Sequence, residues 1–120
     1  MSLRFTVGVT GHRLNQLAEA DRGRIATEIA RTIDQIAAAA TEAAGTVAFT
    51  LASAVAEGAD RYAADAALQL GWRLVCPLPF EIPRYEQDFG DPASVAAFQS
   101  YLKRAAWVRP ADPASVEALD

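Results

Sequence analysis

Hydrophobic and polar positions follow two different periods along this chain, and their alternation predicts strands connected by helices. Residues 5–10, 46–51 and 72–78 are short runs of apolar and β-branched side chains, which predicts three buried strands. Between the first two runs, apolar side chains recur every three or four residues and form the stripe of a long helix: Ile25, Ile29, Ile33, Ile36 and Ala40. This helix should end near Ala44, because Gly45 suits the position just past a helix end.

Similar signals predict two more helices. Residues 59–70 are rich in alanine and are followed by Gly71, which should end the second helix. Residues 79–90 are predicted to form a loop rich in acidic and aromatic side chains. Asp91-Pro92 then provides an N-cap and a first helical residue, and the apolar positions after it share one helical face: Val95, Phe98, Leu102 and Ala105. Trp107 and Val108 are expected to form a very short fourth strand, which Arg109-Pro110 ends.

The alternating order of strands and helices predicts an α/β fold. We expect a three-layer Rossmann-like parallel sheet flanked by helices, with residues 1–120 in a single domain. With three or four strands, this sheet would be incomplete. The helix-opening sequence at residues 91–95 recurs at residues 112–116, so we expect the N-terminal part of a longer domain, or a last helix that docks on a partner. Apolar surface near Trp107 should then be covered by another subunit, in a homo-oligomer, or by residues absent from this sequence.

Composition and charge exclude several classes of protein. Of the 120 residues, 52% are hydrophobic, which is too many for a disordered chain. The net charge of −4 argues against nucleic acid as the main partner, because phosphate backbones favour basic surfaces. No apolar run approaches the roughly 20 residues that cross a membrane, and the first residues show no signal pattern. Cys76 is the single cysteine, so no intrachain disulfide is expected. We expect a cytoplasmic protein with no membrane partner.

The loop after the first predicted strand is the strongest candidate for chemistry. Gly11, His12 and Arg13 follow that strand and precede the long helix. Backbone N–H groups at such a turn can bind an anion, Gly11 would let a ligand approach the backbone, and Arg13 offers a guanidinium suited to phosphate. The alternative is a plain turn whose His12 and Arg13 point into solvent. The spacing alone leaves both interpretations open.

A second candidate loop follows the second predicted strand and contains Ser53, Glu57, Gly58 and Asp60. Ligands of open parallel sheets bind beyond the carboxyl ends of the strands, so the two loops would face each other there. Gly58 permits tight backbone geometry, Glu57 would accept hydrogen bonds from a ribose or amine, and Asp60 would cap the following helix. Taken alone, this loop favours a simpler interpretation, in which Asp60 is only a cap and Glu57 is a solvated side chain.

Metal and catalytic sites have less support. His12 is the only histidine and Cys76 lies in an apolar run, so no metal site is expected from either residue type. The carboxylates of residues 81–91 are irregularly spaced, which predicts a solvated loop rather than a cation site. No serine lies in a G-x-S-x-G elbow, and the first loop has neither Gly-Lys-Ser/Thr nor a full G-x-G-x-x-G. We therefore assign no catalytic residue, metal or cofactor.

Taken together, the two loops resemble a known family. The sequence is similar, in this order, to a bacterial branch of the SLOG superfamily at Val7-Gly8-Val9-Thr10-Gly11-His12-Arg13, Ala56-Glu57-Gly58-Ala59-Asp60-Arg61, Leu78-Pro79-Phe80, Tyr85 and Asp88-Phe89. That superfamily comprises Rossmann-like domains related to the core of DNA-processing protein A and to the lysine decarboxylase-like, cytokinin-activating LOG proteins. The resemblance extends to about Ala106. It implies a nucleotide-binding fold with the ligand near the glycine loops.

The chain departs from that family in one respect that affects function. The later phosphate loop of the LOG branch, Pro-Gly-Gly-x-Gly-Thr, and the catalytic glutamate after it are absent from these residues. The resemblance therefore implies a module that binds or senses a nucleotide or nucleotide derivative, with Gly11, His12 and Arg13 on the phosphate and Glu57 and Gly58 on the sugar side. One alternative is a nucleoside 5′-monophosphate phosphoribohydrolase-like enzyme, completed by a longer chain or another subunit. The other is a ligand-free assembly domain.

Overall fold

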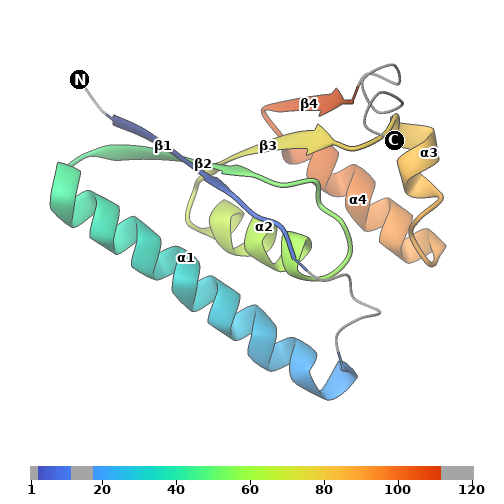
Figure 1. Cartoon of the computed structure of the whole chain (residues 1–120), viewed down its shortest axis with the longest axis horizontal. Helices are drawn as coiled ribbons and strands as arrows, with labels where there is room; N and C mark the ends of the chain where they lie inside the picture. The colour runs from blue at the N-terminus through green and yellow to red at the C-terminus, as the bar shows by residue number, and fades with distance from the viewer. Residues whose placement is uncertain (1–2, 12–17, 112–120) are drawn as a thin grey trace.

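The computed structural model describes residues 3–11 and 18–111 of the chain. Strands and helices alternate through most of this part (Figure 1). In chain order the elements are β1 (Leu3–Gly8), a single turn of 3₁₀ helix (Glu19–Asp21), α1 (Arg22–Ala44), β2 (Val47–Ala52), α2 (Ala59–Gln69), β3 (Arg73–Leu78), α3 (Ile82–Glu86), α4 (Pro92–Arg104) and β4 (Trp107–Pro110).

The four strands form one parallel sheet in the order β1-β2-β3-β4. Phe5 of β1 lies opposite Phe49 of β2, and Leu51 of β2 lies opposite Leu74 of β3. The predicted α/β fold, with its first three strands side by side and parallel, is confirmed. The short fourth strand is also present, and it pairs with β3.

Helices α1, α2 and α4 all lie on one face of the sheet (Figure 1). This follows from the strand order, because successive right-handed crossovers between adjacent parallel strands place every connecting helix on the same side. The described residues therefore form two layers, a sheet and a layer of helices. The third layer of the expected three-layer arrangement is not formed by them, in keeping with the expectation of an incomplete Rossmann-like sheet.

The hydrophobic core lies between the sheet and these helices. Leu51, Leu74 and Cys76 contribute the sheet side of the core and are almost completely buried, while Ile33 of α1 and Phe98 of α4 cover them. Burying a side chain of this size stabilises the fold by roughly 1.5–3 kcal/mol. Because side chains alternate between the two faces of a strand, these residues also identify which strand positions face the helices and which face away.

The predicted helix boundaries agree with the structure. Gly45 ends α1 with a φ of 77°, and Gly71 follows α2 with a φ of 79°, a left-handed conformation that favours glycine. At the start of α4, the Oδ1 atom of Asp91 accepts a hydrogen bond of 2.8 Å from the backbone N–H of Ser94. This is the N-cap that the Asp-Pro sequence predicts.

The prediction of a solvated loop over residues 79–90 is wrong in part. Helix α3 lies within it, and Pro83 occupies the first helical turn, where its missing N–H costs nothing. Tyr85 and Phe89 are buried, and their rings contact Phe98 of α4 with centroid separations of 5.4 and 4.9 Å. The aromatic residues of this segment thus belong to the core, and their burial outweighs the local polar composition.

Candidate functional site

The two candidate loops leave the sheet from neighbouring strands at the same edge. Gly8 at the end of β1 lies opposite Ala52 at the end of β2. The pairing continues one step further, since the N–H of Val9 donates to the carbonyl of Ala52 over 3.1 Å. The N–H of Ser53 donates in turn to the carbonyl of Val75 in β3 over 3.0 Å. Both loops therefore begin from fixed backbone positions at the carboxyl edge.

Gly11 brings these loops into direct contact. A Cβ atom added to Gly11 would lie 2.6 Å from the Cβ of Ala59, the first residue of α2. Real Cβ atoms essentially never come so close, so only glycine fits without a backbone shift. Because Gly11 has no side chain, the first loop can pack directly against the N-terminus of α2.

The second loop is shaped by its own hydrogen bonds. Ser53 is only 1% exposed, and its Oγ accepts a hydrogen bond from the N–H of Val55 and donates one to the carbonyl of Asp60. Val55 is fully buried and has a φ of 48°, an unusual value for a β-branched residue. Such strain persists only where the surroundings enforce it, and it occurs often at binding sites. Ser53, predicted as a ligand-binding residue, lies inside the loop and fixes its shape.

Among the described residues, no side chain caps the start of helix α2. Its N-cap residue is Gly58, with φ and ψ of 101° and −132°, a conformation that is essentially restricted to glycine. The prediction that Asp60 is the cap is wrong, because Asp60 is the second residue of the helix, where its side chain is buried. A carboxylate there is favoured by the helix dipole. Without a capping side chain, the first-turn N–H groups of α2 point toward the edge where the loops meet.

Glu57 is part of a hydrogen-bonded network that links the N-termini of α2 and α4. Its Oε2 atom accepts a short hydrogen bond of 2.5 Å from the hydroxyl of Ser94. The same hydroxyl accepts a hydrogen bond of 3.0 Å from Nη1 of Arg61. Glu57, predicted either to contact a sugar or to be solvated, is thus half-buried and held in place by α4.

Arg61 occupies the centre of this network. Its Nε donates to the carbonyl of Val55 over 2.9 Å, and its guanidinium lies 4.8 Å from the centre of the Phe89 ring. Burial lowers the pKa of Arg61, and the negative charge of Glu57 acts in the opposite direction. Its Nη2 atom is buried and has no hydrogen-bond partner among residues 3–11 and 18–111. A guanidinium has five N–H donors. In Arg61, Nε binds the carbonyl of Val55, Nη1 binds Ser94, and the group stacks on the ring of Phe89.

His12 and Arg13, two of the three predicted phosphate contacts, lie outside the described residues. Next to the end of β1 the structure contains a groove of about 360 Å³, formed mainly by Val7 and Val9 on one side and Ile25 and Ile29 of α1 on the other. Its lining is largely apolar. Of the predicted site residues that the structure describes, none lines this groove.

Other kinds of site receive little support from residues 3–11 and 18–111. No three His, Cys, Asp or Glu side chains in these segments come together in a way that could hold a metal ion. None of the helices in the same segments is both long and apolar enough to cross a membrane. Cys76 is fully buried in the core, and burial raises the pKa of its thiol to about 11, which makes it a poor nucleophile.

Comparison with known proteins gives no family assignment. No protein-family model matches the chain, and neither the curated proteins nor the solved structures include a match. The resemblance to the SLOG superfamily therefore stays a prediction from the residues of the two loops.

The sequence did not indicate which residues outside the second loop contact it. The sequence places Ser94 in a helix-opening signature, and Phe89 in a predicted loop and among the residues of the family resemblance, without indicating their contacts. Their contacts with Arg61 connect segments that are far apart in the chain, and no local period reports such contacts. Arg61 itself is a signal, since a buried arginine in the first turn of an alanine-rich helix needs anionic or aromatic partners.

Proposed function

We propose that this protein binds a nucleotide or a nucleotide derivative at the carboxyl edge of β1 and β2. The observation that carries the proposal is the contact of Gly11 with Ala59, which brings the first loop to the uncapped N-terminus of α2. Glycine-rich turns beside a helix N-terminus are the usual place for a phosphate in parallel α/β proteins.

The parts of the ligand are expected to occupy different parts of this edge. The phosphate would bind the backbone N–H groups at Gly58 and Ala59, with Arg13 and His12 supplying charge-assisted contacts. The apolar groove beside Val7 and Val9 suits a flat base better than a charged group. Glu57 would then accept a hydrogen bond from the sugar, in an orientation set by Ser94.

The resemblance to a bacterial branch of the SLOG superfamily supports the same ligand class. Sequence similarity at both loops and the parallel order of the strands agree with it, and a cytoplasmic location would give access to nucleotides. The phosphoribohydrolase-like enzyme and the ligand-free assembly domain remain the alternatives. No observation at this edge specifically favours either alternative, and the experiment below distinguishes both from the proposal.

Calorimetric titration with nucleoside mono-, di- and triphosphates tests the proposal. Arg13→Ala should weaken binding roughly tenfold or more, because a charge-assisted contact contributes about 1.5–3 kcal/mol. Arg31→Ala is the matched control, since Arg31 is exposed on α1 and forms an ion pair with Glu28 of the same helix. Equal losses in the two variants would indicate a diffuse charge effect instead of a site.

Two further results would redirect the proposal. A wild-type protein that binds no nucleotide at millimolar concentration would favour the assembly domain. Release of a free base from a nucleoside 5′-monophosphate would favour the phosphoribohydrolase-like enzyme, and chromatography of the reaction mixture would detect it.

A further inference from the structure

The face of the sheet opposite the helices has an unusual distribution of charge. Helix-side positions of the strands are apolar, and alternation sends the intervening side chains to the other face. The only charged residues in the four strands are Arg4, Arg73 and Arg109, and all three are exposed and lie on this open face. None of the strands contains an aspartate or a glutamate. In a chain with a net charge of −4, this face is therefore locally basic.

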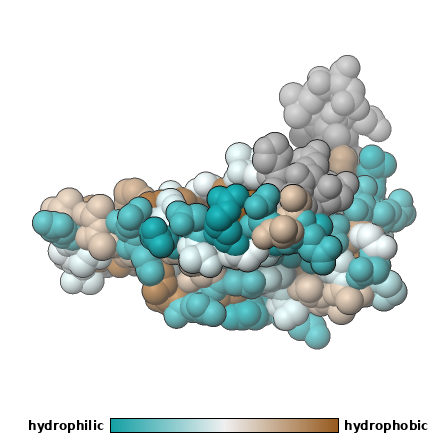
Figure 2. Space-filling view, turned by 90° about the horizontal axis from the view of Figure 1, so that it is seen from below, coloured by the Kyte–Doolittle hydropathy of each residue, from teal (hydrophilic) through white to brown (hydrophobic). Residues whose placement is uncertain are grey.

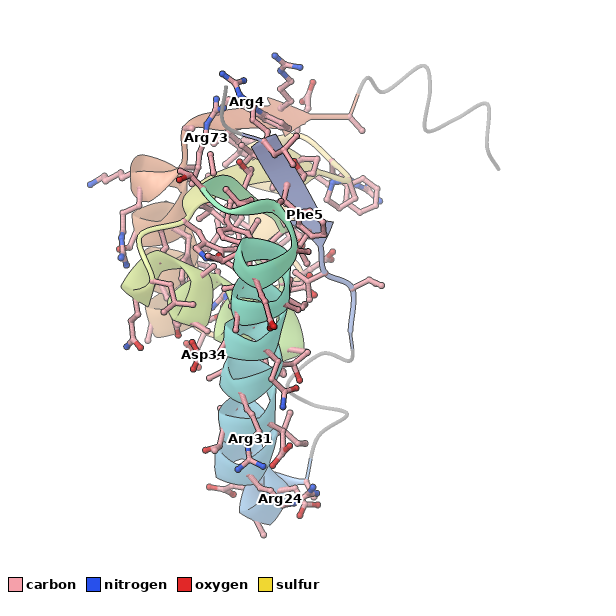
Figure 3. The ribbon with its side chains drawn as sticks, turned by 90° about the vertical axis from the view of Figure 1, so that its left-hand side faces the viewer. Arg4, Phe5, Arg24, Arg31, Asp34 and Arg73 are labelled. Carbon is pink, nitrogen blue, oxygen red and sulfur yellow. The ribbon has the colours of Figure 1, made fainter. Side chains whose placement is uncertain are left out.

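Figure 3 shows this separation directly. Arg4 and Arg73 lie at the sheet, whereas Arg24, Arg31 and Asp34 lie along α1 on the other side (Figure 3). The helix side seen in Figure 2 mixes hydrophilic and hydrophobic residues over its described surface. Within the described segments Arg4 and Arg73 make no ion pair, whereas Arg24 and Arg31 each have a carboxylate partner on or next to α1.

The residues between Arg4 and Arg73 on this face are small. Arg4 lies opposite Ala48, and the next row on this face runs from Thr6 through Thr50 to Arg73. From strand spacing, the Cα atoms of the two arginines are roughly 12 Å apart, with alanine and threonine between them. An α-helix is about 10 Å across. A helix can therefore lie on Ala48 and Thr50 with one arginine on each side.

We propose that this open face binds an acidic amphipathic helix of another protein. The helix would place small or apolar side chains on Ala48 and Thr50 and carboxylates beside Arg4 and Arg73. Parallel sheets are normally covered on both faces by helices, so a helix is the element that this surface accommodates best. The proposal concerns the face away from the helices and is independent of nucleotide binding at the carboxyl edge.

Charge favours an acidic helix over two other partners, a second copy of this chain and a nucleic acid. A second copy docking face to face would bring arginines against arginines, and the described strands have no carboxylate to pair with them. A nucleic acid needs a longer run of basic residues than these arginines provide, and the net charge of −4 would repel it. An acidic helix satisfies the arginines without either penalty.

The test uses two peptides of about 20 residues, long enough to be helical in water. Both have alanine and leucine on one face, and they carry either glutamate or lysine along both flanks. Binding to the intact chain is measured by fluorescence anisotropy at low and at physiological salt. The wild type should bind the glutamate peptide, and Arg73→Glu combined with Arg4→Glu should weaken that binding at least tenfold. The double variant should instead bind the lysine peptide.

Controls distinguish this result from a general charge effect. Arg31→Glu makes a charge change of the same sign on exposed α1 and should leave binding of the glutamate peptide within about twofold. Melting curves should be similar for all variants, because the substituted side chains are exposed.

Several results would overturn the proposal. These are no binding of the glutamate peptide at millimolar concentration, an equal loss in Arg31→Glu, or equal binding of the lysine peptide by the wild type. Sedimentation that shows a dimer lost in Arg73→Glu would assign the face to a second copy. Binding of a labelled oligonucleotide that is lost in the same variant would assign it to nucleic acid.

Discussion

Gly11 and Ala59 are packed so closely that a Cβ atom on Gly11 would lie 2.6 Å from the Cβ of Ala59. Both atoms are attached directly to the backbone, so no side-chain rotation can relieve the contact. The loop after β1 and the start of α2 are thereby held together at the carboxyl edge. The requirement for glycine at this position follows from packing alone, whatever the ligand.

Gly11→Ala should destabilise the protein by about 1–3 kcal/mol, because an inserted methyl group must push the loop away from α2. Chemical denaturation followed by circular dichroism measures the free energy of unfolding. Gly8→Ala is the matched control, since nothing lies within 4 Å of a Cβ placed there. It should be neutral or slightly stabilising. A Gly11→Ala variant as stable as Gly8→Ala would show that the two loops are not in contact in solution.

Gly58→Ala tests the uncapped start of α2. With φ and ψ of 101° and −132°, Gly58 has a conformation that costs an alanine about 1–3 kcal/mol. The variant should lose stability by that amount, measured by urea denaturation. Gly90→Ala is the comparison, because it lacks a positive φ and has open space around its Cα. A loss at Gly90 as large as that at Gly58 would refute the backbone explanation.

Much of the fold could be predicted because its signals are local. Local sequence signals mark the ends of helices: Gly45 marks the end of α1, and Asp91-Pro92 marks the start of α4. The alternation of strands and helices predicts the parallel sheet. The absence of a third layer among the described residues was less visible, because it depends on strand order. A parallel sheet in the order β1-β2-β3-β4 places its helices on one face, and no single segment contains that information.

The candidate site was predicted less completely, for a related reason. The sequence indicated two loops at neighbouring strand ends, and the structure places them together. The sequence did not indicate that Ser53 would be enclosed in its own loop, or that Glu57 would be bound by Ser94. The first is a set of hydrogen bonds within the loop and the second joins the loop to α4, and neither is reported by a hydrophobic period.

Ser94→Ala should destabilise the protein by about 1–3 kcal/mol. The hydroxyl of Ser94 donates to Glu57 and accepts from Arg61, so its removal leaves two half-buried charged groups each short of a partner. Gln99→Ala removes an exposed hydrogen bond to Glu86 and should change stability by less than about 0.5 kcal/mol. Glu57→Gln combined with Ser94→Ala should cost less than the sum of the single changes. Strict additivity would mean that Glu57 and Ser94 do not interact in solution.

The buried thiol of Cys76 predicts a loss of stability in alkaline solution. Burial raises the pKa of Cys76 from its ordinary value of 9.0 to about 11, so the folded state holds this proton more tightly than the unfolded state. The resulting stability is fully present below pH 9 and is lost as the pH rises from 9 toward 11, with a slope of at most about 1.4 kcal/mol per pH unit. Burial, and then its hydrogen bond to Asp65, also raises the pKa of Tyr101, so the tyrosine acts in the same direction.

Urea denaturation between pH 7 and pH 10.5 measures that slope, and two variants separate the two groups. Cys76→Ala should be less stable at every pH because it leaves a cavity, but its stability should fall less steeply above pH 9. In Tyr101→Phe, the part of the pH dependence of stability that comes from the Cys76 thiol should remain. In the folded wild type the thiol should also react slowly with a disulfide reagent at pH 8 and rapidly once unfolded. Fast labelling of the folded protein, or an unchanged slope in Cys76→Ala, would show that Cys76 is not held in a dry core.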